Sequence, residues 1–467
     1  MIRVFKHYIP KSLIFLAIAE FLLFLGSIYV GTYIRYGSVD TAPPGGGDFP
    51  EGLGYISVVY TFIMMSALTA VGLYQRHLRA GIGGMFLRLI MAFLIGLVAM
   101  VVLGYFFPLL FLGRGAFGIS YGVSLLGILL ARYIFIRIVS LNAIKKRILV
   151  IGAGEKASLI EQYFKRKSDR REFNLVGYVH LPHEDVQVDP EKVIETDLTF
   201  MELCKKMDID ELVVAVTDRR KYFPVDDILD CKMSGIEVVD LLTFFERQSG
   251  RIVLDILQPS WLIYSDGFSQ GNMRAISKRL FDITASLLLL VLVSPIMLLT
   301  AILVFLQDFG PIFYKQIRVG QNWRLVQVLK FRSMRVDAEK DGKPQWATKG
   351  DTRVTPLGRF IRKTRIDELP QLINVLRGDM SFVGPRPERP QFVSEFSENI
   401  PYYAERHRVK PGITGWAQIC YPYGASEKDT IAKLQYDLYY VKNYSLFLDL
   451  TILFQTAEVI LLGKGAR

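Results

Sequence analysis

Two adjacent carboxylates, Asp367 and Glu368, stand in an arginine-rich part of this 467-residue sequence. Arg353 and Arg365 precede the pair, and Arg386 follows it between two prolines. Guanidinium groups bind phosphate and carboxylate oxygens through paired hydrogen bonds. An acidic pair surrounded by arginines therefore predicts a site for an anionic, phosphorylated ligand. The alternative for each single arginine is a solvated surface position.

The carboxylates come just before a predicted helix, LPQLINVLR. Pro370 suits the first turn of a helix, and Gly378 suits the position after its last turn. Asp367 would then lie at or near the N-cap, where a carboxylate can accept hydrogen bonds from free backbone amides. Helix capping is therefore the alternative to a catalytic role for Asp367.

A long apolar run at 280–307 precedes this region and has the length of a membrane-spanning helix. Basic residues flank both of its ends, among them Lys278 and Arg279, which favours the cytoplasmic side for both ends. Ser294 and Pro295 lie in the middle. Proline removes an amide donor and bends a helix, and the serine hydroxyl can bond the carbonyl that loses its partner. The pattern predicts a re-entrant helix over 278–308, with a kinked spanning helix as the alternative.

Four further apolar runs, at 12–34, 53–73, 89–112 and 116–138, are each near the ~20 residues that a spanning helix needs. Basic residues lie at the N-terminus, in the second connection and after the fourth run, whereas the first connection is acidic. This distribution predicts a four-helix transmembrane domain over 1–145 with both ends in the cytoplasm. Glu20 lies inside the first run, as a functional group or as a structural hydrogen-bond acceptor.

A strand–glycine–helix pattern occupies residues 147–157, RILVIGAGEKA. Its glycines allow a tight turn and the close approach of a phosphate to the start of a helix. Strand-like runs recur at 175–180, 211–216 and 236–241, which predicts a Rossmann-like α/β domain over 146–262. The second strand ends in Val179 and His180 and lacks the acidic residue that would hold a ribose. We expect a structural or regulatory domain, with a nicotinamide site as the alternative.

Composition limits the class of protein. Hydrophobic residues make up 51% of the chain and charged residues 22%, which excludes a disordered chain and a pure channel. Three scattered cysteines without a CxxC pair indicate a reducing compartment. The net charge of +11 suits an anionic inner leaflet and phosphate substrates, and no nucleic acid is expected. A mostly apolar stretch at 446–464 predicts an interfacial helix, with a core helix as the alternative.

From about residue 275 to 463 the sequence closely resembles the bacterial sugar transferase family, the monotopic polyprenyl-phosphate phosphoglycosyl transferases. The matching stretches are KRLFDITAS, LVSPI, KFRSM, DTRVTPLGRFIRKTRIDELPQLINVLRGDMSFVGPRP and KPGITGWAQI. The preceding helices and Rossmann-like domain resemble the large members that start exopolysaccharide repeat units, and MIRVFKHYIPKSL resembles the exosortase-associated subgroup. The resemblance implies a membrane protein with α and α/β parts and a mainly helical catalytic domain over 263–467.

The resemblance also implies a reaction. A UDP-sugar gives its sugar-1-phosphate to polyprenyl (undecaprenyl) phosphate, so that UMP leaves and a polyprenyl diphosphate sugar remains. Asp367 matches the family's nucleophile, which forms a phospho-aspartate in a ping-pong sequence, and Glu368 is the expected Mg²⁺ ligand. The basic residues expected near the donor phosphates or nucleotide are Arg386, Lys330, Arg332, Arg353 and Arg365.

The same resemblance implies a cellular setting. Ser294 and Pro295 match the family's helix-breaking pair, which strengthens the re-entrant prediction. The protein would lie in the bacterial inner membrane, with its soluble domains in the cytoplasm. It would take its acceptor from the lipid bilayer and hand its product to downstream glycosyltransferases. A homodimer is expected, and the resemblance to the large members implies glucose or galactose as the sugar. The sequence itself does not identify the sugar, because donor selectivity depends on the shape of the pocket.

Two other classes of function stay open from the residues alone. One is a membrane-tethered NAD-dependent sugar-nucleotide oxidoreductase or epimerase that acts in 146–262. A bound nicotinamide cofactor would distinguish it from the transferase. The other is a non-catalytic assembly scaffold, and the intact pair of Asp367 and Glu368 argues against this class.

Overall fold

The computed structural model divides into two compact units, with Tyr8–Ser249 as the main part of one and Gly250–Arg467 as the main part of the other. The charged connections at 38–51 and 75–81, on which the predicted orientation depends, lie outside the described residues. The structure describes residues 2–4, 7–9, 11–37, 52–71, 73–74, 82–110, 112–139, 145–165, 170, 173–182, 184–196, 198–217, 223–265, 267–268, 271–336, 353–421, 424 and 426–461.

The first unit contains long apolar helices. A two-stranded sheet of β1 (Ile2–Val4) and β2 (His7–Ile9) precedes them in the chain. Each of the four N-terminal apolar runs in the sequence coincides with one helix, and these helices are α1 (Lys11–Tyr36), α2 (Leu53–Ala70), α3 (Ile82–Phe106) and α4 (Arg114–Val139). By length and composition, five helices in the described chain can cross a membrane. The chain is therefore a membrane protein.

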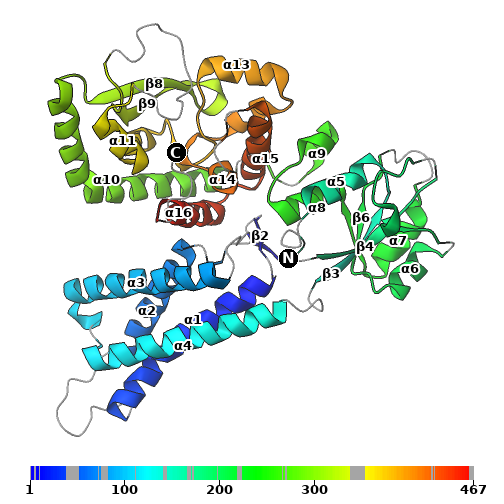
Figure 1. The fold of residues 1–467 in the computed structure, drawn as a ribbon, viewed down its shortest axis with the longest axis horizontal. Helices are drawn as coiled ribbons and strands as arrows, with labels where there is room; N and C mark the ends of the chain where they lie inside the picture. The colour runs from blue at the N-terminus through cyan, green and yellow to red at the C-terminus, as the bar shows by residue number, and fades with distance from the viewer. Residues whose placement is uncertain are drawn as a thin grey trace. The chain divides into compact units, whose positions relative to one another are not determined.

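Glu20 of α1 is buried and paired with Arg132 of α4, which lies alongside α1 (Figure 1). Arg132 Nε lies 2.7 Å from Glu20 Oε1, and Arg132 Nη2 donates to Glu20 Oε2 at 3.0 Å. Arg132 Nη1 also donates to the carbonyl oxygen of Leu73 at 3.2 Å, and the hydroxyl of Tyr74 donates to Glu20. These bonds agree with the structural alternative for Glu20, because they connect it to other segments of the unit.

A five-stranded parallel sheet follows in the chain, and its strand order is β5-β4-β3-β6-β7. This order is that of the doubly wound dinucleotide-binding folds. Four of its strands coincide with the predicted runs, and the two-residue β5 is too short for a sequence pattern to reveal. The strands are β3 (Lys146–Ile151), β4 (Phe173–Val179), β5 (Val193–Ile194), β6 (Glu211–Val214) and β7 (Glu237–Asp240), and the helices are α5 (Glu155–Tyr163), α6 (Phe200–Lys206), α7 (Val225–Met233) and α8 (Leu241–Ser249).

The glycine turn between β3 and α5 is bonded to a carboxylate of the chain itself. Gly152 has a φ of +106°, and a Cβ there would lie 3.2 Å from the backbone of Ala215. The amide of Ala153 donates to Glu184 Oε2 at 2.9 Å. A Cβ on Gly154 would lie only 2.7 Å from Glu184 Oε1. Glu184 therefore occupies the place at the turn where a dinucleotide fold receives its pyrophosphate.

The second unit contains the long helix α10, two small sheets and several short helices (Figure 1). Strands β8 and β9 form an antiparallel hairpin, and β10 and β11 pair in parallel. Its elements are η4 (Leu254–Ile256), α9 (Pro259–Tyr264), α10 (Asn272–Asp308), β8 (Phe313–Val319), η5 (Gln321–Trp323), β9 (Leu325–Phe331), α11 (Pro356–Lys363), η6 (Ile366–Glu368), α12 (Gln371–Arg377), β10 (Ser381–Val383), α13 (Pro390–Asn399), η7 (Tyr403–Arg408), β11 (Gly412–Thr414), α14 (Trp416–Cys420), α15 (Glu427–Asn443) and α16 (Leu446–Leu461).

Helix α10 contains Pro295, and its ribbon bends sharply part-way along (Figure 1). Proline cannot donate to the carbonyl four residues earlier, which is that of Val291. The hydroxyl of Ser294 donates to this carbonyl oxygen at 2.8 Å. The predicted pairing of serine with the freed carbonyl is thereby confirmed. Leu288 and Leu292, just before the bend, are 72% and 73% exposed, so α10 presents an apolar surface there.

Hydrogen bonds and an ion pair connect the first half of α10 to other elements of the second unit. Lys278 Nζ donates to Asp449 Oδ2 of α16 at 2.6 Å, and Asp282 Oδ1 accepts from Ser381 Oγ of β10 at 3.0 Å. Asp449 is fully buried, although a charged residue within an apolar run suggested an interfacial helix. Leu448 of α16 is also fully buried. This face of α16 thus agrees with the alternative of a core helix.

Candidate active site

The carboxylate pair belongs to the short 3₁₀ turn η6, between α11 and α12. Thr355 caps α11, because its Oγ1 accepts from the amide of Gly358 at 2.9 Å. After α11 the chain turns at Arg365, whose φ of +61° lies in the left-handed region that residues with a Cβ seldom adopt. This turn at Arg365 directs the chain into η6.

The predicted helix through LPQLINVLR is α12, and it ends before Gly378, whose φ is +91°. Its N-cap is Pro370 rather than Asp367. The prediction that Asp367 lies at or near this N-cap therefore needs correction, because η6 is inserted as a separate turn. A capping role does not explain Asp367.

Asp367 is 8% exposed, and its Oδ1 is buried without a hydrogen-bond partner in the described part of the chain. Burial raises the pKa of this carboxyl, and the negative charge of Glu368 raises it further. Nearby cations oppose the rise, namely Lys330, Arg362 and Arg365. A buried carboxylate oxygen without a donor is unfavourable, so Oδ1 of Asp367 is available to a further group beyond the described residues.

Glu368 differs from its neighbour because cations hold it. Lys330 Nζ and Arg386 Nη2 each lie 3.0 Å from Glu368 Oε1, and Arg365 Nη1 lies 3.9 Å away. Burial alone would raise the pKa of Glu368, but these cations outweigh burial and hold the pKa far below its usual range. Burial lowers the pKa of Lys330, and Glu368 opposes that change. The pKa values of the two adjacent carboxyls are thus shifted in opposite directions, as in sites where two acids have different roles.

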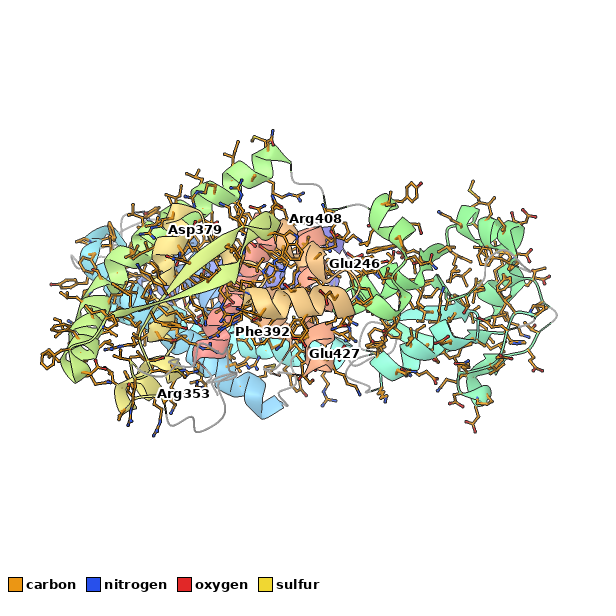
Figure 2. All side chains as sticks on the ribbon, turned by 90° about the horizontal axis from the view of Figure 1, so that it is seen from above. Glu246, Arg353, Asp379, Phe392, Arg408 and Glu427 are labelled. Carbon is orange, nitrogen blue, oxygen red and sulfur yellow. The ribbon has the colours of Figure 1, made fainter. Side chains whose placement is uncertain are left out.

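Two other predicted basic residues are placed differently. Arg332 follows β9, and its guanidinium pairs with Asp308 and donates to the carbonyl oxygen of Val304 at 3.2 Å. It is 8% exposed, so its charge serves the packing of α10 and not the carboxylate pair. Arg353, labelled in Figure 2, begins the segment that leads into α11, and its carbonyl oxygen accepts from the amide of Arg335 at 3.1 Å.

Arg386 lies in the irregular loop 384–388, GPRPE, between β10 and α13. Because two of its residues are prolines, this loop has few backbone amide donors and cannot form regular backbone hydrogen bonds of its own. Its carbonyl oxygens instead accept from donors elsewhere in the unit. The four bonds are Gly412 N to Pro385 O at 3.0 Å, Arg406 Nη2 to Arg386 O at 2.9 Å, Arg318 Nη1 to Pro387 O at 3.0 Å, and Val319 N to Glu388 O at 3.0 Å.

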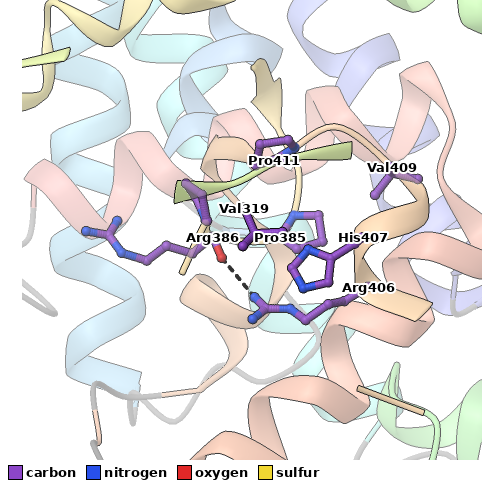
Figure 3. Close-up of a pocket in the computed structure, with 9 residues that line it drawn as sticks. Val319, Pro385, Arg386, Arg406, His407, Val409 and Pro411 are labelled. Carbon is purple, nitrogen blue, oxygen red and sulfur yellow. Dashed lines mark hydrogen bonds between the residues drawn. The ribbon is translucent and has the colours of Figure 1, made fainter. Parts of the chain in front are cut away.

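A small pocket that is open to solvent lies against this loop (Figure 3). The side chain of Arg386 extends away from the other labelled side chains, so its guanidinium and its carbonyl oxygen serve different neighbours. His407 is 6% exposed, and burial together with Arg406 lowers its pKa to about 3, so it is neutral. The pocket is lined by Val319, Gly320, Pro385, Arg386, Pro387, Arg406, His407, Val409 and Pro411.

The sequence analysis did not predict the contacts that Arg318 and Arg406 make with this loop. Their signal is indirect: a loop with two prolines has few backbone donors of its own, so its carbonyl oxygens need donors from outside the loop. The chain supplies them at positions far away in the sequence, and no local pattern identifies which arginine serves which carbonyl.

Part of the chain matches a known protein family. The family model described as bacterial sugar transferase matches residues 273–463. A UDP-glucose:undecaprenyl-phosphate glucose-1-phosphate transferase of Xanthomonas campestris pv. campestris is 34% identical over 338 residues, which cover 69% of this chain and 68% of that protein. The chain belongs to the bacterial sugar transferase family. All of the site residues described above lie inside the matched region.

Two other relatives of this bacterial sugar transferase match shorter stretches of the chain. A UDP-N-acetylgalactosamine-undecaprenyl-phosphate N-acetylgalactosaminephosphotransferase of Aeromonas hydrophila is 45% identical over 237 residues, 51% of this chain and 55% of that protein. A UDP-glucose:undecaprenyl-phosphate glucose-1-phosphate transferase of Klebsiella pneumoniae is 39% identical over 269 residues, 56% of this chain and 57% of that protein. The chain thus spans little more than half the length of these two relatives.

Proposed function

We propose that this protein transfers sugar-1-phosphate from a UDP-sugar to polyprenyl phosphate and releases UMP. The observation that carries this proposal is the contrast within η6. Asp367 has a buried oxygen without a donor, whereas cations surround Glu368 at the next position. A nucleophile that attacks a diphosphate needs both an available oxygen and positive charge nearby. The names of the relatives from Xanthomonas, Klebsiella and Aeromonas support the same reaction.

In this mechanism an oxygen of ionised Asp367 attacks the phosphorus next to the sugar. A bond forms between that oxygen and the phosphorus, and the bond from the phosphorus to the bridging oxygen of the diphosphate breaks. UMP leaves with the bridging oxygen. An oxygen of polyprenyl phosphate then attacks the phospho-aspartate, which releases polyprenyl diphosphate sugar and restores the carboxylate. Two steps allow the soluble donor and the membrane acceptor to react in turn.

The cations have separate parts in this scheme. Arg386 and Arg365 have side chains that are 35% and 43% exposed, so both can reach a ligand from solvent. Lys330 is more buried at 20% and holds Glu368 from the interior. We assign Arg386 and Arg365 to the donor phosphates and Lys330 to the charge balance of the site. Arg353 stays a weaker candidate for the nucleotide, and the packing of Arg332 argues against a direct role.

Mg²⁺ is part of the proposal as the expected cofactor. The donor set fits the ion in kind, because Mg²⁺ takes one or two carboxylates together with substrate phosphates. Glu368 was the expected ligand, but its Oε1 accepts from two cations, whereas Oδ1 of Asp367 lacks a donor. The orphaned oxygen makes Asp367 a second candidate ligand. When bound, the ion would neutralise charge on the donor phosphates.

The membrane part of the proposal rests on α10. Its sharp bend at Ser294 and Pro295 and its exposed apolar surface support a re-entrant helix that enters one leaflet and returns. The acceptor would then reach the site from the lipid bilayer. The protein would lie in the bacterial inner membrane with its soluble parts in the cytoplasm. We further propose that it acts in exopolysaccharide assembly and hands its product to downstream glycosyltransferases. A homodimer and membership of the exosortase-associated subgroup are also part of this proposal.

The test is UMP release by the purified full-length protein, with Mg²⁺, undecaprenyl phosphate and UDP-glucose, UDP-galactose or UDP-N-acetylgalactosamine. We expect one donor to be preferred and Asp367→Asn to lower its rate about a thousandfold or more. Glu395→Gln, at an exposed position of α13, is the matched control and should keep the rate.

A second measurement tests the intermediate. Without acceptor, a donor labelled in the phosphate next to the sugar should label the protein and release at most one UMP per site. Asp367→Asn should abolish this label. Full activity of Asp367→Asn would refute the assigned nucleophile, and turnover without labelling would refute the ping-pong order.

A further inference from the structure

Arg406 is a buried arginine of the second unit, and it contacts the loop that carries Arg386. It is 7% exposed and lies in η7. Its Nη2 donates to the carbonyl oxygen of Arg386 at 2.9 Å (Figure 3), and its Nη1 donates to the hydroxyl of Tyr403 at 2.7 Å. Nη2 also lies 2.9 Å from Asp437 Oδ2. One guanidinium thus joins the loop to η7 and α15.

Asp437 provides the counter-charge for Arg406 from α15. It is 2% exposed, and an arginine so deeply buried requires a partner of opposite charge. The planar guanidinium has several donors in a rigid fork, and here they reach an aromatic hydroxyl, a carboxylate and a backbone carbonyl. A lysine has one ammonium on a flexible stem and cannot reproduce this arrangement. The contact therefore fixes the direction of the Arg386 carbonyl.

The direction of that carbonyl determines where the Arg386 side chain begins. The prolines on either side of Arg386 have restricted φ angles, and Arg318 Nη1 donates to the carbonyl oxygen of Pro387 at 3.0 Å. The guanidinium of Arg386 then extends to Glu368 at 3.0 Å. We propose that Arg406, anchored by Asp437, is a positioning residue that holds Arg386 in place for the donor phosphates. This inference rests on the proposed function, because it assigns Arg386 to the donor.

A shift of about 1 Å in a positioned group can cost about a hundredfold in rate. We therefore expect Arg406→Lys to lower kcat roughly thirtyfold and to change KM less than threefold, because Arg386 is still present but is poorly aimed. Asp437→Asn should have a smaller effect, since its amide oxygen still accepts from Arg406. Asp437→Leu should approach the effect of Arg406→Lys.

The decisive experiment is a double-mutant cycle with Arg386→Ala, which tests whether Arg406 acts through Arg386. Rates of UMP release are measured for full-length Arg386→Ala, Arg406→Lys and the double variant. We expect Arg406→Lys to have no further effect in the Arg386→Ala background, within about twofold. Arg408→Lys is the matched control, because Arg408 lies on the same η7 turn with its side chain 62% exposed, and it should keep the rate.

The outcomes separate the two ideas. If Arg386→Ala alone leaves UMP release unchanged, the assignment of Arg386 to the donor phosphates is refuted. The proposed function then lacks this contact to the phosphates. If Arg386→Ala slows the reaction but Arg406→Lys slows it by the same factor in both backgrounds, the positioning role is refuted and the donor site stands. Thermal unfolding of every variant identifies loss of folding, and Asp437→Asn provides a test that preserves shape.

Discussion

Replacing Glu368 by glutamine tests the division of roles within η6. The substitution keeps the size of the side chain but removes the charge that pairs with Lys330 and Arg386. The negative charge of Glu368 also raises the pKa of Asp367, so its loss lowers that pKa. Lys330 already lowers the pKa of Asp367, and without its carboxylate partner it would lower that pKa further. Both effects of Glu368→Gln on Asp367 have the same sign.

The size of the effect follows from the two contacts. Lys330, 20% exposed, loses a charged hydrogen bond that is worth about 1.5–3 kcal/mol when buried. Arg386, 35% exposed, loses about 1 kcal/mol or less, because solvent screens it. Glutamine still offers a neutral oxygen to both cations. We therefore expect the free energy of unfolding to fall by about 2 kcal/mol, which is a loss of several degrees in Tm.

The assay is the pH dependence of kcat/KM for UMP release. Asp367 must be ionised to attack, so activity falls as the pH is lowered through its pKa. Because this pKa is raised in the native protein, the acid limb should lie above that of an ordinary aspartate. In Glu368→Gln the limb should move to lower pH, although the maximal rate falls about tenfold or more through lost positioning of Arg386.

If the acid limb of the kcat/KM profile of Glu368→Gln stays in place or moves to higher pH, the coupling between the two carboxyls is refuted. Glu395→Gln on α13 is the control for a lost surface charge and should leave the limb unchanged. Thermal unfolding of the same preparation separates a loss of stability from a change in titration.

Three further predictions concern stability, each measured by thermal unfolding in lipid or detergent. Ser294→Ala removes the donor to Val291 and should cost about 1 kcal/mol, whereas Ser294→Thr should not. Arg132→Met leaves Glu20 buried without its ion pair and should cost about 3–5 kcal/mol, with recovery when Glu20→Leu is added. Gly152→Ala, at a φ of +106°, should cost about 1–3 kcal/mol; an unchanged Tm would contradict the strain.

Much of the fold follows from local patterns in the sequence. Apolar runs identify the long helices, because their length matches the thickness of a bilayer. Strand runs and a glycine turn identify the parallel sheet except β5, which has only two residues. Ser294 and Pro295 identify the bend of α10, since the missing amide and the nearby hydroxyl act within one turn. Each of these features depends on neighbours in the chain.

Local sequence patterns predict less of the candidate site than of the fold. The carboxylate pair and Arg386 stand out by type and spacing, but the place of Arg332 does not follow from them. Its partner, Asp308, lies on another element, and only the packing of α10 on β9 brings the two together. The same is true of Arg406 and Asp437, which come from η7 and α15. A basic residue near an active-site motif serves either the ligand or the scaffold, and its partners decide which.

The charges around η6 indicate why a diphosphate suits this site. Lys330, Arg386 and Arg365 all face Glu368, which is ionised throughout the physiological pH range because its pKa is held low. These three cations lie beside a carboxylate that stays ionised, and a diphosphate brings about two further negative charges to the same place. The cations can offset part of that charge as the donor approaches. In the proposed mechanism, the phospho-aspartate that remains after UMP leaves would keep part of that negative charge on Asp367, so the same cations would still face negative charge while polyprenyl phosphate approaches.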